Sequence, residues 1–571
     1  MDFRVERDVM VPMRDGTRLA TDVWLPEHDP APVLLVRIPY DKSDPAGLVT
    51  TLFPDSQALL RAGYAIVWQD CRGTFASEGA FTPLVNEHAD GADTIAWIKS
   101  QPWCNGRIGT FGASYLGFTQ WTAATQQPEG LQAIASTVSS IDYYRHPHYS
   151  EGGAMSWHLM WFWSTYMAMA DNQRGNGDPD AVQALMETLE DPAAPLTTPS
   201  EQEPLKRHCS WWPDWLAHPD RDEYWQDMSV TDRADTVLAP SLNIGGWFDI
   251  FAGSTTRAYT QMKAEAGSPQ ARAGQRLIMG PWDHMNTSGV YANRQFPLAD
   301  VESADLTGVH VAYFDHWLQD DPVALVGRAP VRIFVMGIDQ WRDEADWPLP
   351  DTKYVDYYLD SAGSANTAGG DGILSLDRPS AEVVDRYTYD PARPVPTVGG
   401  RVLSPPLGDA GPADQSVVEA RDDVLCFTTP VLDDAVEVTG TISLTLHVAT
   451  SAKDTDFTGK LVDVYPDGRA LYLTDGILRT RYRNSLSTPE LLEPETVYEV
   501  TLDLSVTSNV FLPGHRIRLE VSSSNFPRFD RNTNTGGAIA EETLKDAVVA
   551  TNQILHGPSH LSRLTLPIID R

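Results

Sequence analysis

Residues 107–121 constrain the fold of this chain more than any other stretch, and they read RIGTFGASYLGFTQW. A short apolar segment runs into a glycine-rich turn around Ser114 and then into a pattern typical of a helix. We interpret the turn as a Gly-x-Ser-x-Gly nucleophile elbow, which holds the serine oxygen clear of a sheet. This predicts a strained backbone at Ser114, small residues two positions to either side, and the N–H of Tyr115 where an oxyanion would form. A chance match is the alternative, and the flanking strand and helix patterns favour the nucleophile.

Apolar runs alternate with helical patterns before and after this turn. The predicted elements are a hairpin over 5–13 and 17–24, apolar runs at 33–38 and 64–68, a helix over 87–99, a run at 238–244, a helix over 253–266 and a run at 275–280. Buried apolar strands separated by helices are typical of βαβ units and a mostly parallel sheet. Ligands bind such sheets at the carboxyl ends of the strands, where Tyr40, Asp70 and Ser114 would lie.

Two loops after the later strands carry residues suited to acid–base chemistry. Asp249 follows the run at 238–244, and His284 follows the run at 275–280. The order Ser114, Asp249, His284 is the order of the catalytic triad in α/β-hydrolases. His284 would take the proton of the serine, and Asp249 would orient the imidazole and stabilise its cation. Asp283 is a rival for the acid, but it neighbours His284 and would have difficulty reaching the far side of the ring.

Other regions of the chain have different patterns. Between residues 142 and 237 aromatic residues are frequent and strand patterns are few, which predicts a helical insertion. From about residue 351 polar and apolar residues alternate, which predicts an antiparallel sandwich. We therefore expect an α/β-hydrolase domain in two parts, 1–141 and 238–350, with a helical cap at 142–237 and a jelly-roll β-sandwich at 351–571.

Composition excludes several classes of protein. The formal net charge of −35 over 571 residues disfavours partners such as nucleic acids and anionic membranes. The start of the chain has no secretory pattern, and the four widely spaced cysteines are typical of structural thiols in a reducing compartment. We expect a cytoplasmic protein without metal or cofactor. A monomer and a homodimer both remain open.

Several stretches resemble one known group of enzymes, which includes bacterial cocaine esterases, X-Pro dipeptidyl-peptidases and α-amino-acid ester hydrolases. They cover most of the chain and read VPMRDGTRLATDVW, LLVRIPYDK, QDCRGTFASEGAF, FGASYLGFTQW, GGWFDIF, GPWDHMN, VRIFVMGIDQWRDEADWPLPDT and HRIRLEVSSSNFPRFDRNTNTGG. The resemblance implies an α/β-hydrolase domain, a helical cap and a jelly roll. It also implies triad roles for Ser114, Asp249 and His284, and it makes the phenol of Tyr40 an oxyanion donor beside the N–H of Tyr115.

The resemblance further implies four residues of the substrate pocket. Trp163 and Phe251 match aromatic pocket residues of the cocaine esterases, whereas His148 and the region of Leu403 replace aromatic ones. These departures predict an acyl pocket that is roomier or more polar.

We therefore predict a serine carboxylesterase for esters with an aromatic or bulky apolar acyl group, whose partners are the small-molecule ester and water. An α-amino-acid ester hydrolase, a β-lactam acylase or an X-Pro dipeptidyl-peptidase is the alternative, and each would need acids to bind an ammonium group. Glu151 is the acid nearest to the aromatic residues of the predicted cap. A non-catalytic ligand-binding protein is the alternative of another class.

Overall fold

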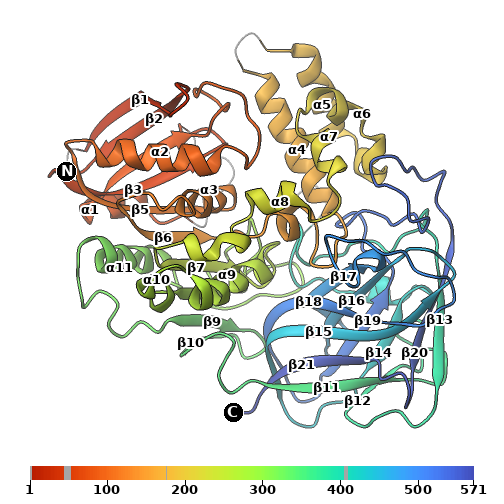
Figure 1. The fold of residues 1–571 in the computed structure, drawn as a ribbon. Helices are drawn as coiled ribbons and strands as arrows, with labels where there is room; N and C mark the ends of the chain where they lie inside the picture. Colours follow the sequence, from red (N-terminus) through yellow and green to blue (C-terminus); the bar gives the residue numbers. More distant parts are fainter. Residues whose placement is uncertain (1–2, 44–52, 175–176, 404–408) are drawn as a thin grey trace.

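The computed structural model describes residues 3–43, 53–174, 177–403 and 409–571, and the described strands form two sheets (Figure 1). The first sheet has ten strands in the order β1-β2-β4-β3-β5-β6-β7-β8-β9-β10. These are β1 (Arg4–Pro12), β2 (Arg18–Leu25), β3 (Ala31–Ile38), β4 (Ala65–Asp70), β5 (Cys104–Ala113), β6 (Leu131–Thr137), β7 (Ser241–Gly246), β8 (Arg276–Gly280), β9 (Val331–Val335) and β10 (Gln340–Glu344). Neighbours from β4 to β9 are parallel, and β1, β2 and β10 pair antiparallel. The predicted α/β-hydrolase sheet is confirmed.

Helices cover both faces of this sheet, which explains why its central strands are largely apolar. They are α1 (Ser56–Arg61), α2 (Glu87–Lys99), α3 (Tyr115–Ala124), α9 (Ala252–Glu265), α10 (Pro269–Ala273) and α11 (Leu306–Leu318). Every residue of β3 is buried. Val33 and Leu35 pack in one cluster with Ile95 of α2, whereas Leu34 packs in another with Phe314 of α11. A strand covered on both faces is mostly apolar, and the charged residue of β3, Arg37, is buried in an ion pair with Glu87 of α2 at 2.6 Å.

Most element boundaries agree closely with the predictions, but one does not. The helix predicted over 87–99 is α2, with the same bounds, and the helix predicted over 253–266 is α9. The run at 238–244 was predicted as a strand from its first residue, and this is wrong because β7 begins at Ser241. Pro240 has no N–H to give to a sheet, and Leu238 is exposed instead of buried.

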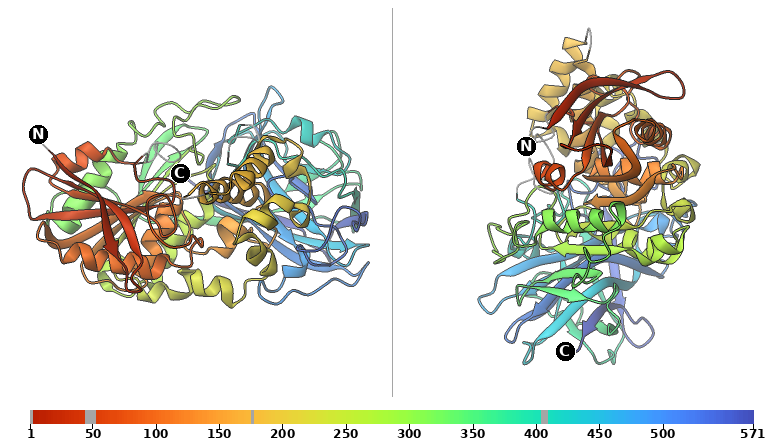
Figure 2. Two further views of the ribbon diagram at one scale, coloured as in Figure 1. Left: turned by 90° about the horizontal axis from the view of Figure 1, so that it is seen from above. Right: turned by 90° about the vertical axis from the view of Figure 1, so that its left-hand side faces the viewer.

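A helical segment lies between β6 and β7. It contains α4 (Trp157–Asn172), α5 (Pro179–Glu190), α6 (Glu203–His208), α7 (Trp212–Ala217) and α8 (Glu223–Met228). Figures 1 and 2 show these helices beside the second sheet, and the N–H of Met155, just before α4, donates to Asp530 Oδ1 at 2.8 Å. Its buried tryptophans join the same apolar cluster as residues of the first sheet. The segment is therefore packed against both parts of the molecule.

The second sheet has eleven strands, and nearly all of its pairs are antiparallel. Its strands are β11 (Lys353–Asp360), β12 (Ile373–Ser375), β13 (Val383–Tyr389), β14 (Leu425–Thr428), β15 (Val436–Thr450), β16 (Asp456–Val464), β17 (Ala470–Arg479), β18 (Tyr498–Phe511), β19 (Arg516–Ser522), β20 (Ala550–His556) and β21 (Arg563–Ile569), with the short helix α12 (Ser416–Glu419) before β14. Alternate residues of these strands meet in a single apolar cluster. The chain thus ends in a β domain, as predicted.

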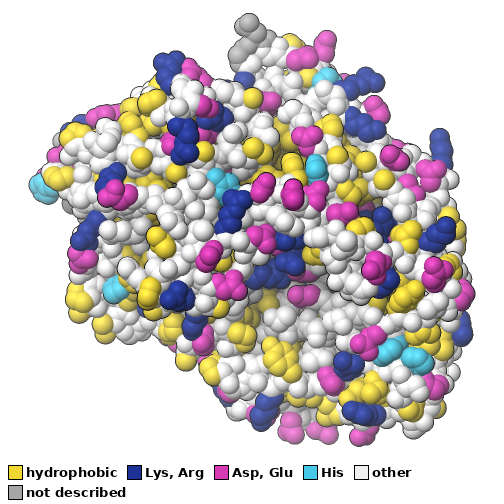
Figure 3. Space-filling model, in the orientation of Figure 1, with side chains coloured by type: hydrophobic (Ala, Val, Ile, Leu, Met, Phe, Trp, Pro, Cys, Tyr) yellow, Lys and Arg dark blue, Asp and Glu magenta, His cyan; other side chains and the backbone are white. Residues whose placement is uncertain are grey.

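The surface shown in Figure 3 carries interspersed acidic and basic side chains. Among the described residues, no helix combines the length and the apolar character needed to cross a bilayer.

Candidate active site

Ser114 stands between the end of β5 at Ala113 and the start of α3 at Tyr115. Its backbone has φ 59° and ψ −122°, a conformation that residues other than glycine seldom adopt. The N–H of Ser114 donates to the carbonyl of Thr137 on β6 at 3.0 Å. The sheet therefore holds the serine in a strained turn, and strain of this kind is common at functional sites.

The spacing of the glycines around Ser114 differs from the predicted Gly-x-Ser-x-Gly pattern. Gly112 stands two residues before Ser114, but Leu116 stands two residues after it, and the second glycine is Gly117. The prediction of a small residue at both positions is therefore wrong. A Cβ atom on Gly117 would lie 2.4 Å from Cβ of Ser139, so the close approach of α3 to its neighbour occurs one residue later. Leu116 is instead fully buried in the apolar cluster.

Three side chains from three loops form one hydrogen-bonded series. Ser114 Oγ lies 3.0 Å from His284 Nε2, and His284 Nδ1 lies 2.6 Å from Asp249 Oδ2. Asp249 comes from the loop after β7 and His284 from the loop after β8, as the order of the strands requires. With the proton on Nδ1 donated to the carboxylate, Nε2 faces the serine as an acceptor. Asp249 is fully buried and His284 is 7% exposed.

The structure distinguishes the two candidate acids. Asp249 Oδ1 accepts the N–H of Phe251 at 2.7 Å, which leaves Oδ2 directed at the imidazole. Asp283 accepts the N–H groups of Met285 and Asn286 in its own loop. Burial raises the pKa of Asp283, and it has no hydrogen bond to His284 among those found in the described chain. Asp249 is therefore the acid that contacts the histidine.

Tyr40 and Tyr115 lie beside the serine. Both line the cavity into which Ser114 opens, and their rings meet edge to face with centroids 6.5 Å apart. Burial raises the pKa of the Tyr40 phenol, so it stays protonated and can donate. The N–H of Trp163 donates to Tyr40 Oη at 2.9 Å, a contact that sequence reasoning missed. No local pattern could have indicated it, because the two residues are 123 positions apart.

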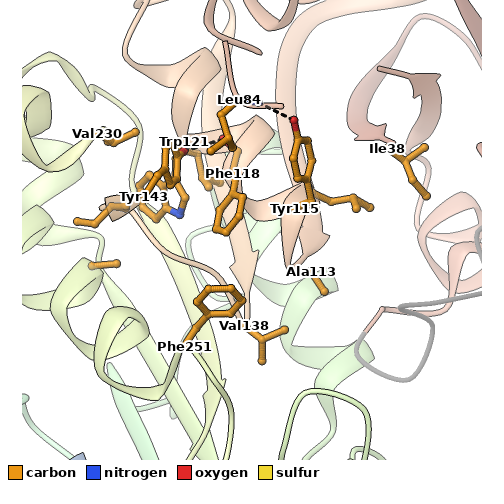
Figure 4. Close-up of a cluster of buried hydrophobic side chains, with 14 of the residues drawn as sticks. Ile38, Leu84, Ala113, Tyr115, Phe118, Trp121, Val138, Tyr143, Val230 and Phe251 are labelled. Carbon is orange, nitrogen blue, oxygen red and sulfur yellow. Dashed lines mark hydrogen bonds between the residues drawn. The ribbon is translucent and has the colours of Figure 1, made fainter. Parts of the chain in front are cut away.

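The cavity encloses about 730 Å³ of empty space, including its mouth, and aromatic and aliphatic side chains form most of its wall. Figure 4 shows Phe118 and Phe251 in the apolar cluster beside it, with the hydrogen bond between Leu84 and the Tyr115 hydroxyl. The four residues predicted for the substrate pocket all line the cavity: His148, Trp163, Phe251 and Leu403. Further lining residues that the sequence did not indicate include Met160, Phe162, Trp215, Ile250 and Met285.

The acid predicted to serve an ammonium-binding alternative is not in the cavity. Glu151 is absent from its lining, which includes no Asp or Glu among the residues that the structure describes. Glu151 Oε1 lies 2.5 Å from Arg257 Nη2 and 3.3 Å from His146 Nε2. Although burial alone would raise its pKa, the charge of Arg257 and the contact with His146 hold that pKa well below its usual range. Glu151 is already paired.

Other polar clusters in the described chain offer no metal site: no group of three or more His, Cys, Asp or Glu side chains there is placed to hold a metal ion. All four cysteines are free thiols, and Cys71, Cys209 and Cys426 are buried.

Known proteins resemble this chain along most of its length. Residues 15–286 match the family model of the X-Pro dipeptidyl-peptidase (S15 family), and residues 326–565 match that of the X-Pro dipeptidyl-peptidase C-terminal non-catalytic domain. The chain is 49% identical over 580 residues to the cocaine esterase of Rhodococcus sp. (strain MB1 Bresler), covering 100% of this chain and 99% of the relative. The resemblance inferred from the sequence is confirmed.

Two solved structures share the fold along the whole chain. One is an aminopeptidase from the marine sediment archaeon Thaumarchaeota archaeon, with a TM-score of 0.84, 26% identity and coverage of 100% of this chain and 97% of the other. The other is an α-amino-acid ester hydrolase, with a TM-score of 0.82, 26% identity and coverage of 99% and 97%. Because its identity to the Rhodococcus relative extends from end to end, the chain belongs to the X-Pro dipeptidyl-peptidase (S15) family and is a serine hydrolase.

Proposed function

We propose that this serine hydrolase is a carboxylesterase that acts on esters with an aromatic or bulky apolar acyl group. The observation that supports this most strongly is the cavity itself, where Ser114 faces an aromatic and aliphatic wall without a carboxylate among its described lining residues. Burying apolar surface contributes roughly 25 cal/mol per Å², so such a wall favours a phenyl ring over a small acyl group. The Rhodococcus relative is named a cocaine esterase, and cocaine, which carries a benzoyl ester, is a candidate substrate.

In the proposed reaction, His284 Nε2 takes the proton of Ser114 as Oγ attacks the ester carbonyl. The tetrahedral intermediate then collapses, and the leaving alcohol takes that proton from His284 as the acyl–oxygen bond breaks. Water attacks the resulting acyl-enzyme with His284 again as the base, which releases the acid and restores the serine. Asp249, hydrogen-bonded to Nδ1 at 2.6 Å, stabilises the imidazolium in both halves.

The negative charge on the carbonyl oxygen requires preorganised donors. We assign these to the phenol of Tyr40 and to the N–H of Tyr115. Tyr115 is the first residue of α3, so its N–H has no acceptor within the helix. The N–H of Trp163 occupies a lone pair of Tyr40 Oη, which leaves the phenolic proton available for the oxyanion. The positive end of the helix favours the same charge.

The acyl group would lie among Trp163, Phe251, His148 and Leu403. The indole of Trp163 stacks on Tyr115 at 6.0 Å between centroids, with an interplanar angle of 11°. Phe251 meets the His284 ring edge to face at 5.6 Å, next to the reacting serine. This places aromatic surface on two sides of the nucleophile.

The alternative substrates carry an α-ammonium, as the α-amino-acid ester hydrolase among the similar structures would suggest. A buried cation needs an anionic partner, and losing one costs several kcal/mol. Glu151 is occupied by Arg257 and does not line the cavity. The arrangement therefore favours an uncharged acyl group.

A comparison of two substrates tests this choice. We expect kcat/KM for a benzoyl or phenylacetyl ester to exceed that for the matching phenylglycine ester, because the added ammonium would enter the cavity unpaired. Trp163→Ala should reduce the preference more than Glu151→Gln does. A preference for the phenylglycine ester that Glu151→Gln removes would instead favour the amino-ester hydrolase.

We further propose the domain limits. Residues 1–141 and 238–350 form the catalytic domain, residues 142–237 form a cap, and residues 351–571 form a jelly roll. The cap is supported by Leu159, Met160 and Trp163 of α4, which line the cavity. The jelly roll is supported by the predominantly antiparallel pairing of β11–β21.

Four free cysteines favour a reducing compartment, so we propose that the enzyme works in the cytoplasm. Whether it does so as a monomer or a homodimer is a separate question that its mass in solution would answer.

A further inference from the structure

His148 is a buried histidine in the wall of the catalytic cavity. It ends the short helical turn Tyr144–His148, which precedes α4, and it is 2% exposed. The same cavity is lined by Ser114 and His284. The triad does not use His148, so its imidazole needs another explanation.

One nitrogen of the ring is accounted for and the other is not. Nδ1 lies 2.7 Å from the carbonyl of Tyr143, which can only accept, so Nδ1 carries the proton. Burial lowers the pKa of His148 to about 3, and the ring is therefore neutral at pH 7. Nε2 is then a pure acceptor, and within the described parts of the chain it has no hydrogen-bond partner.

The neighbours of the ring leave little room for a partner from the protein. The Trp215 ring meets it edge to face with centroids 4.2 Å apart, and the Trp225 ring lies at 4.4 Å. Tyr143 closes the Nδ1 edge. Because His148 also lines the catalytic cavity, a ligand bound there is the remaining source of a donor for Nε2, and a buried acceptor without one is costly.

We propose, on the basis of the proposed esterase function, that His148 Nε2 accepts a hydrogen bond from a hydroxyl group on the aromatic ring of the acyl group. The preferred substrates would then be hydroxyaryl esters, such as hydroxybenzoates, and not plain benzoates. A neutral imidazole with its proton fixed on Nδ1 distinguishes a hydroxyl from a methoxy group of similar electronic character, since only the hydroxyl can donate.

Matched substrates test this directly. The kcat/KM of the purified enzyme at pH 7 is measured for phenyl benzoate and for six derivatives. These carry a hydroxy or a methoxy group at the ortho, meta or para position of the benzoyl ring. We expect one hydroxy isomer to exceed its methoxy counterpart by about tenfold, the effect of one buried neutral hydrogen bond. The other two isomers should show no such ratio, because only one ring position can reach Nε2.

Variants identify the acceptor. His148→Phe keeps an aromatic ring and removes Nε2, so the hydroxy-to-methoxy ratio should fall to about one, whereas His148→Gln retains an acceptor and should keep part of it. His158→Phe is the matched control. His158 is also buried, and its Nε2 has no hydrogen-bond partner among the residues that the structure describes. It lines a neighbouring hollow and not the catalytic cavity, so the ratio should not change.

Two results would overturn the subsite: a ratio near one for every isomer with the wild-type enzyme, or a ratio that survives in His148→Phe. If His148→Phe does not fold, as its thermal melt would show, the wild-type ratios and His148→Gln decide. Failure of the proposed function looks different, because the wild-type enzyme would then hydrolyse neither phenyl benzoate nor its derivatives.

Discussion

Each half of the molecule contains a serine, a histidine and an aspartate in hydrogen-bonding contact. In the α/β domain these are Ser114, His284 and Asp249. In the β domain they are Ser361, His556 and Asp385: His556 Nε2 lies 2.8 Å from Asp385 Oδ2 and 3.2 Å from Ser361 Oγ. The residue types are the same, so the differences between the two groups lie in their geometry.

The catalytic histidine uses its two nitrogens for two different partners, whereas His556 directs one nitrogen at both. Ser361 Oγ donates to Asp385 at 2.8 Å and accepts the N–H of Gly363 at 2.9 Å, so its proton and a lone pair are already engaged. His556 is fully buried, and neither it nor Ser361 is among the residues that line the described cavities. A nucleophilic serine therefore requires a histidine that contacts the serine through one ring nitrogen and the aspartate through the other. It also requires a cavity through which substrate reaches the serine. Three suitable side chains do not by themselves provide either condition.

Replacing the two serines should give the largest contrast. Ser114→Ala should lower kcat by about a millionfold, as loss of the nucleophile does in other serine hydrolases, while the fold is retained. Ser361→Ala should leave kcat close to that of the wild type. Steady-state hydrolysis of phenyl benzoate measures both, and labelling by a fluorophosphonate should disappear only in Ser114→Ala. Near-normal turnover by Ser114→Ala would refute the assignment.

Replacing Asp249 should lower kcat, whereas replacing Asp385 should lower stability. Asp249→Asn keeps the size of the side chain but removes the charge that fixes the His284 tautomer, so kcat should fall by about ten-thousandfold. The pH profile of single-turnover acylation would show the loss directly. A reduction below tenfold would mean that another acid, with Asp283 the first to examine, supports the histidine.

Asp385→Asn is the control, and its effect should be on stability. Burial alone would raise the pKa of Asp385, but hydrogen bonds from His556, Ala365 and Ser361 outweigh it and lower that pKa. A carboxylate with a lowered pKa stabilises the fold above its ordinary pKa and loses this contribution as the pH falls through the folded value. We expect a loss of about 1–3 kcal/mol in the free energy of unfolding at pH 7. Denaturant titrations should show the difference from the wild type shrinking below about pH 4.

The comparison also shows what could be predicted from the sequence. Ser114, Asp249 and His284 each follow a buried apolar strand, and parallel strands bring such positions to one edge, so their meeting could be anticipated. Ser361 and His556 lie 195 positions apart among antiparallel strands, where a shift of one residue in register reverses every side chain. Their contact could not be anticipated from local patterns.

The same limit applies inside the catalytic cavity. The resemblance to known esterases implied that Trp163 and His148 belong to the substrate pocket. It did not show that Trp163 donates to Tyr40, or that His148 Nε2 has no hydrogen-bond partner among the described residues. Glu151 looked available because its partner Arg257 is 106 positions away, in α9. Charge pairing across elements depends on packing, which hydrophobic periodicity does not specify.

Removing one tyrosine hydroxyl from each domain should give a smaller contrast in kcat. Tyr40→Phe should lower kcat by about a hundredfold with little change in KM, the usual loss for one preorganised oxyanion donor. Tyr387→Phe removes a hydroxyl that contacts Ser523 Oγ at 2.8 Å in the β domain, and it should change only stability. Stopped-flow acylation rates and thermal melts measure the two effects. An unchanged kcat in Tyr40→Phe would transfer the oxyanion to backbone donors alone.

The smallest effect expected concerns the indole that contacts Tyr40. Trp163→Phe preserves an aromatic ring next to Tyr115 but removes the N–H that lies 2.9 Å from Tyr40 Oη, so the phenol is less well oriented. We expect kcat to fall by about tenfold, close to the value of one neutral hydrogen bond. In a Tyr40→Phe background the same substitution should cost almost nothing further, because the group that it positions is gone.

Trp215→Phe is the matched control for this double-mutant cycle. Its ring also stacks on Trp163, at 5.9 Å and 24°, and lines the cavity, but it has no hydrogen bond to Tyr40 among those of the described residues. Its effect on kcat/KM should therefore add to that of Tyr40→Phe. Additive effects for Trp163→Phe as well would mean that this indole serves only as a wall of the acyl pocket. Non-additivity confined to Trp163 would make it a positioning residue for the oxyanion donor, a role that the buried tryptophans farther from the serine do not share.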